Sequence, residues 1–148
     1  DTVANCGIST KGQYICTLTL TDVHSGWTEN RALLNKAHRW VKEAVDDVKE
    51  KLPFQMKGID SDNGSEFSGL SKLFKEGKVY FAHPYSSGER GTNEKHNSLV
   101  RRFIPKGQPI DEITDDELIQ INWYLNCRPL KCLNWRTPIE IFLRNLRY

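Results

Sequence analysis

Residues 14–22, YICTLTLTD, decide the fold, because their side chains alternate strictly between two kinds. Tyr14, Cys16, Leu18 and Leu20 are apolar, whereas Ile15 and three threonines occupy the positions between and after them. This alternation and the many β-branched residues predict a β-strand with one face toward the core. Residues 2–6 predict a preceding strand, and the stretch that contains Gly12 forms the turn between the two.

Helix and strand patterns alternate through the rest of the chain. Between residues 30 and 51 apolar residues recur at steps of three and four, which predicts an amphipathic helix that Pro53 ends. Thr114 and Glu117 match a helix capping box. The other predicted elements are strands at 54–60 and 78–82 and helices at 64–76, 92–103, 114–126 and 138–146. This order predicts an α/β fold with a mixed central β-sheet flanked by helices.

Length and composition are those of a single globular domain, which we assign to residues 1–148. No apolar run approaches the ~20 residues of a membrane helix, and no charged start followed by an apolar stretch marks a secretory signal. The four cysteines are widely spaced, which favours reduced thiols over a disulfide framework or a zinc site. We therefore expect a cytoplasmic protein without a membrane partner.

The net charge of +2 hides an uneven distribution of charged residues. Residues 1–71 carry −2, residues 72–106 carry +5 and residues 107–148 carry −1. Basic charge that is concentrated in one segment of 35 residues is compatible with binding to a polyanion.

A first candidate site lies at the end of the strand predicted at 54–60. Asp60 and Asp62 are two residues apart, on one face of an extended chain, and Asn63 and Gly64 follow where the chain turns. Strand ends are the usual ligand-binding edge of an open α/β sheet, and either aspartate could be the ligand. The alternative is an ordinary turn in which the aspartate bonds only to its own backbone.

A second candidate is a glycine-containing loop that leads into a helix. Glu94 lies in the first helical turn, and Asn97, Ser98 and Arg101 follow on the same face. The alternative for Glu94 is a simple interaction with the positive helix N-terminus. The basic residues around it are either phosphate contacts or an ordinary solvated face; they are Arg90, Lys95, Arg101 and Arg102.

Asp1, directly before a predicted strand, supplies a third carboxylate. Carboxylates from two strands and one helix can hold a pair of Mg²⁺ ions, which prefer oxygen ligands. Such a pair activates an attacking oxygen and stabilises the leaving oxygen of a phosphodiester. The basic helix beside it would hold a nucleic-acid substrate.

Several segments resemble the catalytic core of the retroviral integrase and insertion-sequence transposase superfamily, whose members have an RNase H-like fold and an Asp, Asp, Glu metal triad. The resemblance extends over nearly the whole chain. The segments that carry it are residues 62–67 (DNGSEF), 83–106 (HPYSSGERGTNEKHNSLVRRFIPK), 126–131 (NCRPLK) and 135–138 (WRTP).

The resemblance implies roles for individual residues. Asp62 matches the second triad member, and Glu94 matches the third with 31 residues between them. Asp1 is assigned as the first by position, with Asp22 as its competitor, and Glu89 is the competitor of Glu94. The resemblance therefore implies that Asp1, Asp62 and Glu94 are catalytic residues that bind two Mg²⁺ or Mn²⁺ ions. Arg90, Lys95, Asn97, Arg101 and Arg102 are the expected DNA contacts.

The implied function is metal-dependent DNA cleavage and strand transfer in a bacterial, nucleoid-associated enzyme that acts on element ends and target DNA as a dimer or larger multimer. Three alternatives remain open: a nuclease that only hydrolyses, a catalytically inactive DNA-binding module, and a scaffold within a larger complex. Members of the superfamily also carry residues before the first aspartate and an upstream DNA-binding region, so we expect the chain to be a core taken from a longer protein. His83 and His96 are expected to be solvated surface residues rather than ligands.

Overall fold

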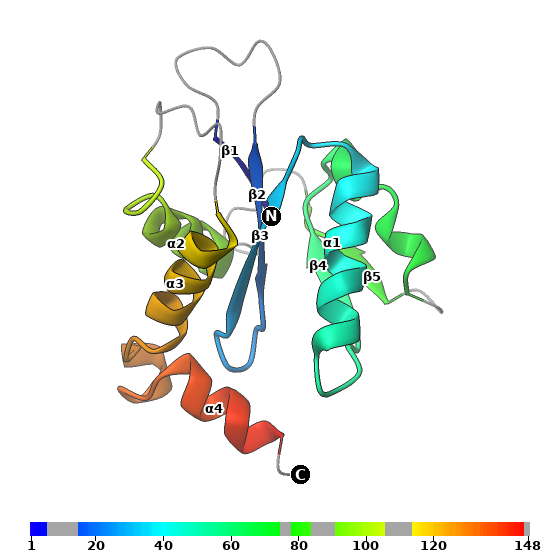
Figure 1. Ribbon diagram of the computed structural model, residues 1–148. Helices are drawn as coiled ribbons and strands as arrows, with labels where there is room; N and C mark the ends of the chain where they lie inside the picture. The colour runs from blue at the N-terminus through cyan, green and yellow to red at the C-terminus, as the bar shows by residue number, and fades with distance from the viewer. Residues whose placement is uncertain (6–14, 75–77, 84–90, 106–113, 147–148) are drawn as a thin grey trace.

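A three-stranded antiparallel sheet forms the centre of the protein in the computed structural model (Figure 1). The structure describes residues 1–5, 15–74, 78–83, 91–105 and 114–146, and the side chains of residues 92–94 fall outside that description. The sheet order is β1 (Thr2–Ala4), β2 (Cys16–Thr21) and β3 (Thr28–Leu33). The alternating segment YICTLTLTD therefore contains the central strand, as predicted.

Two further strands form a parallel pair, β4 (Ile59–Ser61) with β5 (Val79–Phe81). The described strands thus include both antiparallel and parallel pairs, but they fall into two hydrogen-bonded groups. The helices are α1 (His38–Lys51), α2 (Gly91–Val100), α3 (Asp115–Asn126) and α4 (Pro138–Asn145), with short 3-10 turns at Ser65–Phe67, Leu70–Lys72 and Lys131–Leu133. None of the described helices is long and apolar enough to cross a membrane.

The two faces of the central sheet are covered by different helices. α1 lies on one side and α2 and α3 on the other (Figure 1). Cys16 and Leu18 pack with Val41 and Val45 of α1, together with apolar residues of the 3-10 turns. On the opposite face Thr17 and Thr19 of β2 are also buried, where Thr17 accepts a hydrogen bond from Asn5 and Thr19 donates one to Asn30. The alternation in the sequence therefore separates an apolar layer from a buried polar one.

Three predicted elements differ from the structure. The helix predicted at residues 30–51 begins only at His38, because residues 28–33 pair with β2 along their whole length as β3. The strand predicted at 54–60 is shorter and later, at Ile59–Ser61, where it pairs with β5. The predicted helix at 64–76 consists of two 3-10 turns in its described part. In the first two of these segments the boundary is set by pairing with another strand. The local sequence of a segment does not show that pairing.

The capping box predicted at the start of α3 is present. The Glu117 carboxylate accepts hydrogen bonds from the Thr114 backbone N–H at 2.9 Å and from its hydroxyl at 3.0 Å, and these bonds lower the pKa of Glu117. Thr137 and Glu140 form the same arrangement at α4, and the pKa of Glu140 is lowered for the same reasons. A lowered pKa in the folded state stabilises the fold above the unfolded-state value of ~4.3, and this contribution is lost as the pH falls through the folded-state value.

Replacing Thr114 with alanine is expected to raise the pKa of Glu117 partway toward its ordinary value, because the hydroxyl donor is lost while the backbone donor remains. An NMR pH titration of the glutamate side chains measures this shift. Glu140 is the internal control, and its lowered pKa should not change in this variant. An unchanged Glu117 titration would contradict the capping geometry.

Candidate functional site

Asp1 is held at the start of β1 by hydrogen bonds to both of its carboxylate oxygens. The Thr2 backbone N–H donates to Asp1 Oδ1 at 2.8 Å, and Asn97 Nδ2 donates to Asp1 Oδ2 at 2.7 Å. Asn97 belongs to α2, which packs against β2. The Asn97 contact therefore joins two predicted site residues that are 96 positions apart in the sequence.

Position 94, the predicted third triad member, also belongs to α2 and lies three residues before Asn97. In an α-helix, residues at this spacing occupy the same face. The Glu94 side chain lies outside the described residues, as do Glu89 and Arg90. The structure thus places the helix that carries position 94 in contact with Asp1, the residue directly before β1, and the role of Glu94 stays a prediction.

Asp62 lies directly after β4, at the start of a tight turn. Its Oδ1 accepts a hydrogen bond from the Gly64 backbone N–H at 3.0 Å, which is the local turn bond that the sequence left open as an alternative. Asn63 Nδ2 donates to the Ala82 carbonyl at 2.9 Å and so fastens this turn to the end of β5. The turn bond involves one carboxylate oxygen of Asp62 and is compatible with a ligand role for the group.

Glu66 is a fourth carboxylate at this site, and sequence reasoning assigned it no role. The Thr2 hydroxyl donates to Glu66 Oε1 at 2.8 Å, and the Glu66 side chain is only 12% exposed. Lys36 Nζ lies 3.9 Å from the same oxygen. The available signal was its place within the DNGSEF segment, four residues after Asp62, but spacing alone does not show that it reaches Thr2.

The predicted DNA-binding residues divide into two groups. Lys95 and Arg102 are exposed on and just after α2. Asn97 and Arg101 are half-buried, and the Arg101 guanidinium donates to the Ala4 carbonyl at 2.8 Å and to Asn5 Oδ1 at 3.3 Å. The second group therefore holds β1 in place.

One expectation about histidines was wrong. His96 is buried, with 6% of its surface exposed, because its helix packs against the sheet on that side. His83 is exposed, as expected.

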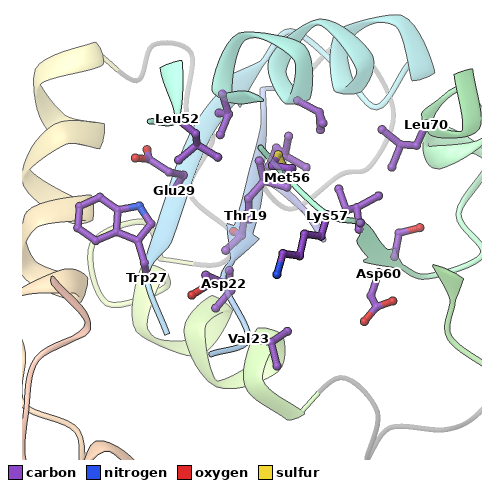
Figure 2. Close-up of a pocket in the computed structure, with 18 of the residues that line it drawn as sticks. Thr19, Asp22, Val23, Trp27, Glu29, Leu52, Met56, Lys57, Asp60 and Leu70 are labelled. Atoms are coloured by element: carbon purple, nitrogen blue, oxygen red, sulfur yellow. The ribbon is translucent and has the colours of Figure 1, made fainter. Parts of the chain in front are cut away.

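A cavity of about 650 Å³ lies between the β2–β3 hairpin and the segment that leads into β4. Figure 2 shows Asp22, Trp27 and Glu29 on one side of it and Lys57 and Asp60 on the other. Asp1 also lines this cavity, whereas Asp62 is not among its lining residues. The Asp22 backbone N–H donates to the Trp27 carbonyl at 2.8 Å, and the Asp22 carboxylate accepts a hydrogen bond from the Ser25 backbone N–H at 2.9 Å. Asp22 is therefore used in closing the turn at residues 22–27.

The oxygen atoms of the carboxylates at this site are of the kind that binds a hard divalent cation. Asp1 and Asp62 offer carboxylate oxygens, which Mg²⁺ and Mn²⁺ prefer, and the Glu66 carboxylate bonds to Thr2 beside them. Among the described side chains, no group of three His, Cys, Asp or Glu residues is close enough to hold a metal. The Glu94 side chain, the third predicted ligand, is outside the described set.

Comparison with known proteins gives a consistent relationship. No protein-family model matches the chain. A probable transposase for the insertion-like sequence element IS1161 of Streptococcus salivarius is 40% identical over 126 residues, which is 84% of this chain and 36% of that protein. The transposase InsI for insertion sequence element IS30C of Escherichia coli K12 is 36% identical over 140 residues, which is 93% of this chain and 36% of that protein. The chain thus spans little more than a third of the length of these relatives.

Solved structures agree with this assignment at the level of the fold. The catalytic core domain of BIV integrase superposes with a TM-score of 0.66 at 19% identity, covering 97% of this chain and 92% of the other. The HTLV-2 integrase catalytic core domain in complex with magnesium gives a TM-score of 0.60 at 16% identity, covering 95% and 91%. The α/β fold is therefore RNase H-like. The chain is therefore similar in sequence to transposases of insertion sequence elements over most of its length, and its fold is that of the retroviral integrase catalytic core domains.

Proposed function

We propose that the protein cuts DNA and joins the cut end to a target by divalent-metal-dependent phosphoryl transfer, as in transposition. The observation that carries this proposal is the 2.7 Å hydrogen bond between Asn97 and Asp1. It brings α2, the helix that contains position 94, to Asp1, the residue directly before β1. The DNGSEF turn with Asp62 is fastened to the same strand by the bond between Thr2 and Glu66.

In this proposal Asp1, Asp62 and Glu94 would hold two Mg²⁺ or Mn²⁺ ions. The bound ions supply Lewis-acid activation of the attacking oxygen and stabilise the leaving oxygen. The protein's own part is to fix the ligands: Asn97 orients one Asp1 oxygen and the Thr2 N–H orients the other. The magnesium in the HTLV-2 core complex supports the choice of metal.

The basic segment would bind the DNA backbone. Lys95 and Arg102 are exposed, as phosphate contacts require, and Arg90 belongs to the same proposed surface. For Asn97 and Arg101 we propose a second role beside DNA contact, which is support of β1. Because transposition joins two element ends, we expect a dimer or larger multimer acting on DNA in the bacterial cytoplasm and nucleoid.

Replacing Lys95 and Arg102 together with glutamine is expected to weaken DNA binding at all sequences alike. Each lost phosphate contact lowers the slope of log affinity against log salt by about 1, so the pair should lower it by about 2. Fluorescence anisotropy at several salt concentrations measures the slope. The control is Lys42→Gln, which removes an exposed charge from α1 on the opposite side of the sheet and should leave the slope unchanged. An unchanged slope in the double variant would contradict this DNA surface.

The function itself is tested with the whole protein and labelled DNA that carries an element end. Calorimetric titration with Mn²⁺ should show binding, and incubation with Mg²⁺ or Mn²⁺ should give joined products that chelation abolishes. Cleaved but never joined products would favour a hydrolytic nuclease. Absence of both metal binding and cleavage would favour an inactive DNA-binding module.

A further inference from the structure

We infer that Glu66 is a positioning residue that fixes the strand of Asp1 relative to the turn of Asp62. This inference rests on the proposed function, because it treats Asp1 and Asp62 as metal ligands. The need for such a residue follows from the sheet topology. In the described chain β1 belongs to one hydrogen-bonded group of strands and β4 to the other, so backbone pairing does not set the distance between the two aspartates.

The Thr2–Glu66 hydrogen bond spans this gap. Thr2 is the residue next to Asp1, and its backbone N–H already bonds to Asp1 Oδ1. The Thr2 hydroxyl then donates to Glu66 Oε1 at 2.8 Å, across 64 positions of sequence. One residue therefore contacts both the Asp1 carboxylate and Glu66, and a shift of Glu66 would be passed directly to Asp1.

The other oxygen of Glu66 faces the Asp62 turn. A methyl group placed on Gly64 would lie 2.5 Å from Glu66 Oε2 and 2.9 Å from Asp62 Oδ1. Both carboxylates thus crowd the same face of Gly64, which has an ordinary φ of −61° and is not required there by its backbone conformation. The absence of a side chain at position 64 lets Glu66 pass close to Asp62 on its way to Thr2.

Glu66 is held between buried neighbours. Glu66 is 12% exposed at its side chain, Phe67 beside it is buried in the core under α1, and the turn at Ser65–Phe67 packs against α1. Lys36 approaches Glu66 Oε1 at 3.9 Å and is itself 41% exposed, so it supplies partial charge compensation from the solvent side. Second-layer partners that orient metal ligands typically change metal affinity about 10- to 100-fold when they are lost.

The test uses variants that separate hydrogen bonding from charge. Thr2→Val removes the donor, Glu66→Ala removes the acceptor, and Glu66→Gln keeps an acceptor of the same size without charge. Thr2→Val and Glu66→Ala should each weaken Mn²⁺ binding about tenfold, and the double variant should be no weaker than Glu66→Ala. Glu66→Gln and Thr2→Ser should each bind Mn²⁺ with an affinity within about threefold of the wild-type affinity. The matched control is Glu43→Gln, an exposed site on α1.

A second readout needs no metal. The NMR signal of the Asn97 side-chain amide reports on its bond to Asp1 Oδ2. It should shift in Thr2→Val and Glu66→Ala and stay in place in Glu66→Gln. If the wild type binds no Mn²⁺ while these shifts occur, the proposed function fails and the positioning role stands. If Thr2→Val leaves both readouts unchanged, or if Glu66→Gln behaves like Glu66→Ala, the positioning role is overturned.

Discussion

Replacing Asp62 with asparagine is expected to lower strand transfer at least about 10³-fold in the whole protein, and Glu94→Gln should have the same effect. Losing one ligand of a catalytic metal removes several kcal/mol of transition-state stabilisation, and about 4 kcal/mol corresponds to a 10³-fold loss of rate. Asparagine keeps the oxygen that accepts the Gly64 N–H bond, so the turn and the fold should be retained. The measurement is the yield of joined labelled DNA with Mg²⁺ and with Mn²⁺, alongside thermal unfolding.

Asp60 provides the discriminating variant, because the sequence left either aspartate open as the ligand. Asp60 is exposed and lines the cavity with Asp1, whereas Asp62 lies at the turn beside Glu66. Asp60→Asn should stay within about tenfold of wild-type activity, a margin of about 1.4 kcal/mol. If Asp60→Asn abolishes joining and Asp62→Asn does not, the ligand is Asp60, and the metal site lies toward the cavity of Figure 2.

The elements that the sequence predicted correctly are those with local physical causes. The central strand β2 follows from strict alternation of side chains, and the start of α3 follows from a threonine and a glutamate three residues apart. These signals need no partner from elsewhere in the chain. They explain why the α/β class and most helices were predictable from the residues alone.

β3 was not predictable in the same way. Its sequence, TENRAL, is polar, and its last residues fit the apolar spacing of the helix that follows. The strand exists because six residues pair with β2 and because α3 contacts it from more than 90 positions away. Those contacts are tertiary, so a reading of local periodicity assigns the segment to the wrong element.

For the candidate site too, some features follow from the local sequence and others depend on tertiary contacts. Residue types and spacing left Asp60 and Asp62 both open as ligands, and the resemblance of residues 62–67 and 83–106 to the integrase and transposase superfamily singled out Asp62 and Glu94. The bond between Asn97 and Asp1 and the bond between Thr2 and Glu66 depend on the packing of α2 and of the Ser65–Phe67 turn. Sequence could therefore name the carboxylates, and it could not show which side chains hold them in place.

Asn126 is expected to be the polar residue whose loss destabilises the fold most. Its side chain is 1% exposed and bonds to both backbone groups of Thr28, accepting from the N–H and donating to the carbonyl at 2.8 Å each. Thr28 lies on β3, which pairs with β2 on one side only among the described strands. Asn122, one helical turn earlier, bonds to the Asn30 backbone N–H at 3.0 Å. The two asparagines of α3 thus cover the open edge of β3.

Asn126→Ala should lower the free energy of unfolding by about 3 kcal/mol, because each buried backbone group left without a partner costs about 1–3 kcal/mol. For a domain of this size, that corresponds to a fall in melting temperature of about 8 °C. Chemical denaturation followed by circular dichroism measures the change.

The matched control is Gln120→Ala, an exposed position on the same helix, which should change stability by less than about 0.5 kcal/mol. Asn126→Asp separates the two bonds. It keeps the acceptor for the Thr28 N–H, loses the donor to the Thr28 carbonyl, and places a negative charge in a buried site. It should therefore be at least as destabilising as Asn126→Ala at neutral pH and should regain stability as the pH falls and the carboxyl is protonated. If Asn126→Asp leaves the free energy of unfolding at pH 7 unchanged, the Asn126 side chain does not hold the edge of β3. The attachment of α3 must then come from its apolar face alone.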